Sequence, residues 1–158
     1  MTQIGHAMST PPASVPPETS LKETARHMAD ARVGALPVVE DDHVVGVVTD
    51  RDLVVRAMAG GLSPDLRVDA VMSADPVTVD VGTTLPAAQH AMRSIGVRHL
   101  PVTDGGRLAG MVSFDDLFIH LTSQQVALAD VVDTAREARD PFHPGGISRS
   151  RADSTGFE

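Results

Sequence analysis

The sequence predicts an α/β protein (α+β in some classifications) in which one β-α-β-β-α unit occurs twice. Three observations support this: an internal repeat, paired apolar stretches joined by polar turns, and helical periodicity beside them. The repeat has an offset of 64 positions, since 72 − 8 = 64. The identical pieces are Met8-Ser9 and Met72-Ser73, Leu36-Pro37-Val38 and Leu100-Pro101-Val102, and Asp52-Leu53 and Asp116-Leu117.

Each copy contains an amphipathic helix with a recognisable start. Ser20 and Glu23 fit a capping box in the first copy. In the second copy Thr84 is the expected cap, and Pro86 falls in the first turn, where its missing N–H costs nothing. The apolar residues that recur at helical spacing are Leu21, Ala25 and Met28 in the first copy and Leu85, Ala88 and Met92 in the second.

A hairpin follows each of these helices, with Asp41-Asp42 or Gly105-Gly106 at its turn. An initial strand is expected at Val77–Val79 in the second copy. Its counterpart at 13–15 is flanked by prolines, so we expect it to be short or irregular. The expected hairpin strands are Leu36–Val39, Val44–Thr49, Leu100–Thr103 and Leu108–Ser113.

The last helix of each copy is expected to begin at Asp50 or Phe114, and Gly60-Gly61 signals where the first of them ends. Beyond the second copy the chain turns rich in Pro, Gly, Ser and Arg. The expected segments are a first repeat at 6–60, a linker at 61–70, a second repeat at 71–121, a C-terminal helix at 122–139 and a disordered tail at 140–158.

Composition excludes several classes of function. With 13 basic and 21 acidic side chains the net charge is −8, which repels nucleic acid and anionic membranes, so we expect neither as a partner. The absence of cysteine excludes disulfides and thiolate metal sites, and the seven histidines show no metal-binding spacing. No apolar run reaches the roughly 20 residues of a membrane span, and no secretory signal is visible at the start. We therefore expect a cytoplasmic protein without a metal site.

The turn after each hairpin carries the polar groups most suited to chemistry. Residues 46–52 and 110–116 share the pattern Gly-apolar-apolar-[Thr/Ser]-x-x-Asp. This places a hydroxyl at a strand end and a carboxylate one helical turn later, an arrangement that suits a ribose diol and a phosphate. The alternative is a plain helix N-cap. Aspartate also favours helix starts for dipole reasons alone, so we expect no catalytic residue among these carboxylates.

These features together resemble a tandem pair of CBS (cystathionine-β-synthase) domains, also called a Bateman module. The resemblance covers 6–121 and extends to small stand-alone bacterial CBS-domain proteins of the hypoxic-response type. It implies two repeats packed through their sheets about a pseudo-twofold axis, and a homodimer formed through exposed helix faces. The candidate residues for these faces are Met28, Val54, Met58, Met92, Phe118 and Leu121.

The resemblance also implies a non-enzymatic regulatory role without an obligatory cofactor. The expected ligand is AMP, ADP or ATP, and less strongly NAD or S-adenosylmethionine. It would place Asp52 and Asp116 on ribose hydroxyls, and Thr49 and Ser113 near phosphate. The full set of expected ligand-binding residues is Thr49, Asp50, Arg51, Asp52, Val77, Thr78, Val79, Arg98, His99, Ser113, Asp115 and Asp116.

The first copy departs from the family pattern. Gly34 and Ala35 stand where the second copy has the basic pair Arg98 and His99, so we expect two unequal clefts. Two functions stay open at this point. One is an adenylate sensor that signals to an effector protein in trans. The other is a ligand-free structural or stress-associated dimer that acts only through protein contacts.

Overall fold

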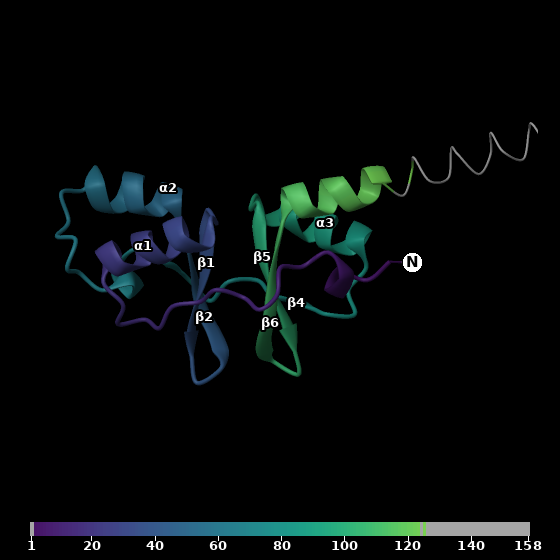
Figure 1. Cartoon of the computed structure of the whole chain (residues 1–158), viewed down its shortest axis with the longest axis horizontal. Coiled ribbons are helices and arrows are strands. Elements are labelled where there is room, and N and C mark those ends of the chain that lie inside the picture. Colours follow the sequence, from purple (N-terminus) through teal and green to yellow (C-terminus); the bar gives the residue numbers. More distant parts are fainter. Residues whose placement is uncertain (1, 124, 126–158) are drawn as a thin grey trace, which may run out of the picture. The chain divides into compact units, whose positions relative to one another are not determined.

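The computed structural model of the chain describes residues 2–123 and 125. The C-terminal helix expected at 122–139 and the tail expected at 140–158 fall outside the described residues, apart from 122, 123 and 125. Two three-stranded sheets flanked by helices confirm the α/β class (Figure 1).

The first repeat follows the expected order of a helix, a hairpin and a second helix. Its elements are α1 (Leu21–Ala31), β1 (Ala35–Glu40), β2 (His43–Thr49), α2 (Asp50–Asp52) and η2 (Leu53–Met58). The Ser20 side chain accepts from Glu23 N and the Glu23 side chain accepts from Ser20 N, which confirms the capping box. The second helix begins at Asp50 as expected, but from Leu53 it is π-helical. The N–H of Ala59, for example, donates to the carbonyl of Val54.

The second repeat has the same plan with two additional short strands. Its elements are η3 (Val68–Ala70), β3 (Ser73–Ala74), β4 (Val79–Asp80), α3 (Leu85–Ile95), β5 (His99–Asp104) and β6 (Arg107–Ser113), and a further helix begins at residue 114. Thr84 caps α3 through the N–H of Ala87. The strand expected at Val77–Val79 is shorter than predicted, since β4 starts only at Val79.

The two hairpins have the same register. β1 and β2 pair antiparallel with Pro37 opposite Val47, and β5 and β6 pair with Pro101 opposite Met111. At the first turn both Asp41 and Asp42 have positive φ, at 49° and 65°, a conformation that aspartate tolerates. In the equivalent turn of the second hairpin, Gly105 and Gly106 also have positive φ.

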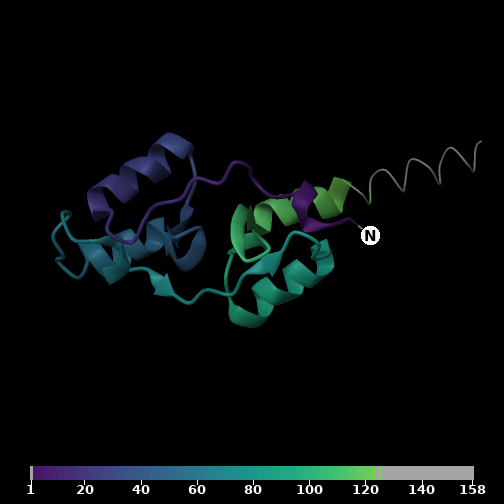
Figure 2. The same cartoon turned by 90° about the horizontal axis from the view of Figure 1, so that it is seen from below.

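The opening segment of each copy pairs with the sheet of the other copy. Ser73 in β3 pairs with Val47 in β2, and Ser9 forms the equivalent antiparallel bridge with Met111 in β6. Figure 2 shows the N-terminal segment in purple crossing to the green second repeat. The sheets of the two copies are therefore completed by exchange, a pairing between positions far apart in the sequence.

Each repeat has its own hydrophobic core, and the exchanged segments contribute to it. Ile4 and Ala7 are buried in the core of the second repeat, whereas Val68 and Val71 are buried in that of the first. The first core contains Val15, Leu21, Met28, Leu36, Val38, Val48, Ala57, Val68 and Val71. The second contains Ile4, Ala7, Leu85, Ala88, Met92, Leu100, Val102, Val112 and Leu117.

Two residues expected on exposed helix faces are buried. Met28 is 5% exposed and Met92 is 1% exposed, because the apolar stripes of α1 and α3 face their own sheets. Val54 and Met58, at 56% and 75%, do lie on the surface. Among the residues that the structure describes, no helix is both long and apolar enough to cross a membrane.

Gly46 and Gly110 allow the exchanged segments to lie close to the hairpins, so alanine at either position should destabilise the fold. A Cβ on Gly46 would overlap the Met72 side chain, whereas one on Gly110 would lie 2.7 Å from Met8 Sδ and 2.9 Å from the backbone oxygen of Ser9. We expect each Gly→Ala variant to lower the free energy of unfolding by about 1–3 kcal/mol. Urea titration of the two variants measures this loss.

The two glycines should differ in whether the loss can be rescued. Met72→Ala removes the obstructing side chain, so the double variant with Gly46→Ala should show strong favourable coupling. Met8→Ala leaves the Ser9 carbonyl in place, so its coupling with Gly110→Ala should be weaker. Equal coupling in both pairs would contradict this explanation.

Candidate functional site

The two polar turns have the same internal geometry. The N–H of Thr49 donates to Asp52 Oδ2 at 2.9 Å, and the N–H of Asp52 donates to Thr49 Oγ1 at 3.1 Å. Ser113 and Asp116 form the same pair of bonds at 2.9 and 3.1 Å. Each carboxylate therefore completes a capping box through a single oxygen, Oδ2. The N-cap interpretation is confirmed, and the Oδ1 atoms lie outside the box.

Two clefts are built around these turns, each from parts of both repeats. The Asp52 cleft has a cavity volume of about 500 Å³. It combines the turn at 49–52 with the segment at 95–101 of the second repeat. Its lining residues are Val47, Thr49, Asp50, Arg51, Asp52, Ser73, Pro76, Val77, Ile95, Gly96, Val97, Arg98, His99, Leu100 and Pro101.

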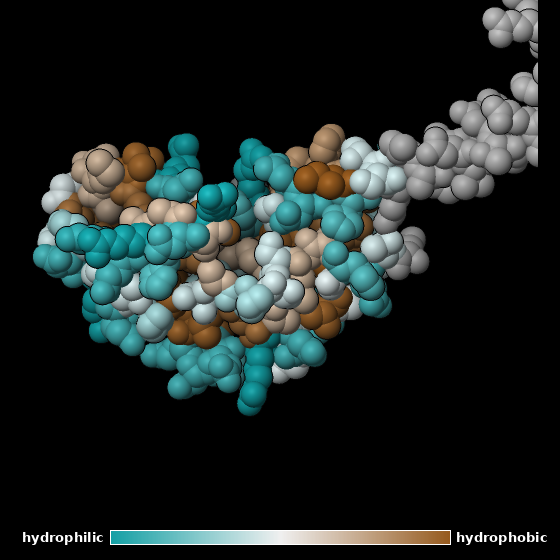
Figure 3. All heavy atoms as spheres, in the orientation of Figure 1, coloured by the Kyte–Doolittle hydropathy of each residue, from teal (hydrophilic) through white to brown (hydrophobic). Residues whose placement is uncertain are grey.

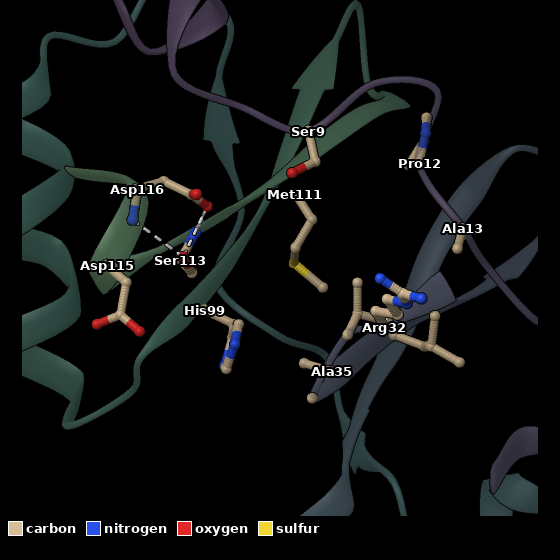
Figure 4. A pocket seen from close by; sticks show the side chains of 13 residues that line it. Ser9, Pro12, Ala13, Arg32, Ala35, His99, Met111, Ser113, Asp115 and Asp116 are labelled. Carbon is tan, nitrogen blue, oxygen red and sulfur yellow. Dashed lines mark hydrogen bonds between the residues drawn. The ribbon is translucent and has the colours of Figure 1, made fainter. Parts of the chain in front are cut away.

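The Asp116 cleft is built from the equivalent segments of the two repeats and has a volume of about 330 Å³. Here the turn at 113–116 meets the segment at 32–36 of the first repeat, and Figure 4 shows both sides. Its lining residues are Ser9, Pro12, Ala13, Arg32, Val33, Gly34, Ala35, Leu36, His99, Met111, Ser113, Asp115 and Asp116.

Most residues predicted from the sequence lie in these clefts. Seven line the Asp52 cleft: Thr49, Asp50, Arg51, Asp52, Val77, Arg98 and His99. Ser113, Asp115 and Asp116, again with His99, line the Asp116 cleft. Thr78 and Val79 line neither cleft. Thr78 borders a depression beside His43 and Thr103, and Val79 in β4 packs against the second core.

Arg98 lies at the border between the two clefts. Arg98 lines the Asp52 cleft, while its Nη2 lies 3.1 Å from Oδ1 of Asp115, a residue that lines the Asp116 cleft. The guanidinium also stands 5.7 Å from the centre of the Phe114 ring. Because both members of the ion pair are exposed, the pair contributes at most about 1 kcal/mol, so Arg98 can leave it for a ligand at small cost.

His99 lines both clefts and has a perturbed pKa. Burial lowers the pKa of its imidazole below the ordinary value of 6.5, and the neighbouring Arg98 acts in the same direction. The carboxylates of Asp50, Asp116 and Asp115 oppose this shift but do not overcome it. The ring is therefore neutral at pH 7. Its counterpart in the first repeat is Ala35, so a single imidazole serves both clefts.

Arg32 is a lining residue that the sequence analysis did not identify. It ends α1 and lies in the Asp116 cleft, on the side opposite Ser113 and Asp116 in Figure 4. Arg32 lies outside the positions immediately before the Leu-Pro strands, where Gly34 and Ala35 differ from Arg98 and His99. The available signal was that Arg32 aligns with a helix-ending glycine, Gly96.

Comparison with known protein families gives a match over most of the chain. The CBS domain family model matches residues 4–58 and 68–123. The CBS domain-containing protein YhcV of Bacillus subtilis is 34% identical over 127 residues, 80% of this chain and 91% of that protein. Hypoxic response protein 1 of Mycobacterium tuberculosis is 30% identical over 128 residues, 80% of this chain and 90% of that protein.

Solved structures show the same fold. CBS domain protein PAE2072 from Pyrobaculum aerophilum, complexed with AMP, is 26% identical with a TM-score of 0.69, covering 77% of this chain and 99% of that one. Hypoxic Response Protein I, with two coordinated zinc ions, is 30% identical with a TM-score of 0.69, covering 75% and 98%. In the described part of this chain, no group of three or more histidine and acidic side chains is arranged to hold a metal.

The position of His99 predicts a pH dependence of stability. Since its pKa is lower in the folded than in the unfolded state, the unfolded chain binds more protons just below pH 6.5. Its contribution is therefore fully present above pH 6.5 and is lost as the pH falls through the lowered folded-state pKa. We expect His99→Gln to flatten the fall in Tm between pH 7.5 and pH 5 relative to the wild type.

Thermal unfolding followed by circular dichroism across this pH range measures the effect. The exposed His27 of α1 supplies the control for losing one histidine. Parallel Tm profiles for the wild type and His99→Gln would show that burial of this imidazole does not contribute.

Proposed function

Since the chain belongs to the CBS domain family, we propose that it is a regulatory module that binds an adenosyl nucleotide between its repeats and signals to a partner protein in trans. The Asp52 cleft is the proposed principal site. AMP is the first candidate ligand, with ADP and ATP next, and NAD and S-adenosylmethionine after them. The proposal assigns the chain no catalytic step.

The apolar wall of the Asp52 cleft is the observation that carries this proposal. Val77, Ile95 and Val97 are 46%, 44% and 38% exposed and all line the same cavity. Large aliphatic side chains that stay in water on one face of a cleft favour a flat apolar ligand, because covering them releases hydration water. An adenine ring has the matching shape and polarity.

Polar groups on the facing side of the cleft suit the rest of a nucleotide. The capping box leaves Asp52 Oδ1 for a ribose hydroxyl, although Arg56 Nε lies 3.4 Å from it. Arg51 and Arg98 supply cations for a phosphate, and a net charge of −8 makes such local cations necessary for holding an anion. The AMP complex of PAE2072 supports the choice of ligand for this fold.

A bound ligand would change which relative orientation of the two repeats is favoured. The Asp52 cleft takes Thr49 and Asp52 from the first repeat and Val97 and Arg98 from the second, so one molecule in it would bridge both. A ligand that bound more tightly to one relative orientation of the repeats would shift the population toward that orientation. A partner protein could then recognise the selected state.

The second candidate is a ligand-free structural or stress-associated dimer. It is favoured by the capping boxes, since a helix N-cap alone accounts for an aspartate at positions 52 and 116. Similarity to Hypoxic response protein 1 supports a role in stress under either function. The two candidates differ in whether any nucleotide stabilises the protein.

We also propose an isologous homodimer through the helices of the first repeat. Val54, Val55 and Met58 of η2 are 56%, 51% and 75% exposed, and Figure 3 shows apolar surface over the helix that α2 and η2 form together. Beside them an apolar groove with a volume of about 570 Å³ runs between α1 and η2, lined by Leu21, Lys22, Ala25, Arg26, Ala29, Leu53, Ala57, Met58, Leu62 and Pro64. Exposed apolar surface of this kind favours association with a second copy.

Thermal unfolding with and without nucleotide tests the proposed ligand. For protein purified free of ligand, AMP at about 1 mM with a Kd near 10 μM stabilises by about 2.7 kcal/mol. This corresponds to a rise in Tm of roughly 5–10 °C. Val77→Asp places a charge on the apolar wall, so we expect it to reduce the AMP-induced shift by at least half.

Leu66→Asp is the matched control, since Leu66 is 39% exposed but lines neither cleft. Its AMP-induced shift, measured from its own ligand-free Tm, should equal that of the wild type. If no adenosyl compound shifts the wild type, the ligand-free dimer becomes the better explanation.

Light scattering coupled to size exclusion tests the proposed dimer. Met58→Glu places a charge in the centre of the exposed apolar face, so we expect a monomer where the wild type is a dimer. Val77→Asp serves as the control here, since Val77 is 46% exposed and lies outside the groove, and it should stay dimeric. A wild type that is monomeric at about 100 μM, or a dimeric Met58→Glu variant, would exclude this interface.

A further inference from the structure

Arg32 has a backbone conformation that its residue type disfavours. It ends α1 with φ 55° and ψ 45°, and its N–H donates to the carbonyls of Met28 and Ala29. The equivalent end of α3 has Gly96 at φ 69° and ψ 34°. A left-handed residue at a helix end is usually glycine, because a Cβ there costs roughly 1 kcal/mol. The first repeat thus accepts an unfavourable side chain where the second avoids one.

The chemistry of Arg32 also distinguishes it from the other residues in this conformation. In the part of the chain that the structure describes, the remaining non-glycine residues with positive φ are all aspartates, namely Asp41, Asp42 and Asp75. A short aspartate side chain can hydrogen-bond locally and tolerates this region. A long guanidinium gains nothing comparable from the turn itself, which points to a role for its side chain.

The side chain of Arg32 lines the Asp116 cleft and is unpaired. Figure 4 shows the guanidinium reaching into this cavity across from Ser113 and Asp116. No described residue accepts a hydrogen bond from it or forms an ion pair with it. Arg98, by contrast, is paired with Asp115. Arg32 is the one arginine among the described lining residues of the Asp116 cleft.

Position 34, the pseudo-symmetric counterpart of Arg98, is a tight place for a side chain. In the second repeat the basic side chain stands at position 98, and the pseudo-symmetric position in the first repeat is Gly34. A Cβ on Gly34 would lie 3.3 Å from Asp50 Oδ2, which is tighter than ordinary van der Waals contact. A side chain at position 34 would therefore require the Asp50 carboxylate to shift by a few tenths of an ångström. Two residues earlier, the αL backbone at Arg32 gives a guanidinium access to the same cavity.

We propose that Arg32 is the anion-binding, specificity-determining residue of the Asp116 cleft, and that it makes this cleft select ligands carrying a phosphate group. A guanidinium donates two parallel hydrogen bonds to phosphate oxygens, which a neutral nucleoside does not offer. The inference rests on the proposed function in one respect, the adenosyl identity of the ligand. The anion site itself follows from Arg32.

Calorimetric titration in the Val77→Asp background tests the inference, because we expect that substitution to weaken binding in the other cleft. Arg32→Gly should weaken AMP binding by about tenfold or more while leaving adenosine binding unchanged, and Arg32→Lys should recover part of the loss. Arg93→Gln removes an exposed cation of α3 outside both clefts and outside the apolar groove, and should bind AMP like its parent. The ligand-free Arg32→Gly protein should unfold about 1–3 °C higher, because glycine suits this backbone.

The outcomes separate this inference from the proposed function. If AMP binds Arg32→Gly as tightly as its parent, the inference is overturned and the proposed function stands. If no adenosyl compound binds but pyrophosphate stabilises the wild type and not Arg32→Gly, the proposed function fails and the anion site stands. If neither probe binds, both are overturned. A lower Tm for Arg32→Gly would assign Arg32 a structural role instead and overturn the inference.

Discussion

The exchange of opening segments between the repeats is the constraint on which the rest of the structure depends. Each hairpin buries only part of its surface alone, and the missing contacts come from the opening segment of the other copy, as in the pairings of Ser9 with Met111 and of Ser73 with Val47. Ile4 and Val68 then enter cores to which they are not adjacent in sequence. Because Ser9 and Ser73 also line the clefts, the element that joins the repeats forms part of both sites.

Pseudo-symmetry explains why there are two clefts, and its local failures explain why they differ. The turns at 49–52 and 113–116 keep the same capping bonds, so the polar side of each cleft is held by backbone geometry. The facing walls have diverged. His99 aligns with Ala35, and Arg98 aligns with Gly34, so in the first repeat the arginine of the wall is Arg32.

Local features of the fold could be predicted from the sequence, and non-local ones could not. The capping box at Ser20 and the hairpin strands depend on near neighbours, and they were predicted correctly. Strand β3 forms only because it pairs with β2 across the linker. It is two residues long, which is too short for a sequence periodicity to indicate it. The burial of Met28 was misjudged because a helical stripe indicates an apolar face without saying which surface covers it.

The candidate site followed a similar division. Residues at the strand ends were identified because the Gly-apolar-apolar-[Thr/Ser]-x-x-Asp pattern is contiguous, whereas Arg32 acts through a backbone angle that residue identity does not encode. The same division bears on regulation. The capping bonds hold Asp52 and Asp116 at the helix starts through Oδ2, whereas the wall residues take no part in these bonds and differ between the two clefts. Each cleft combines the capped turn of one repeat with a wall from the other repeat. A duplicated fold of this kind can keep the same turn in both clefts and still acquire two different specificities through the walls.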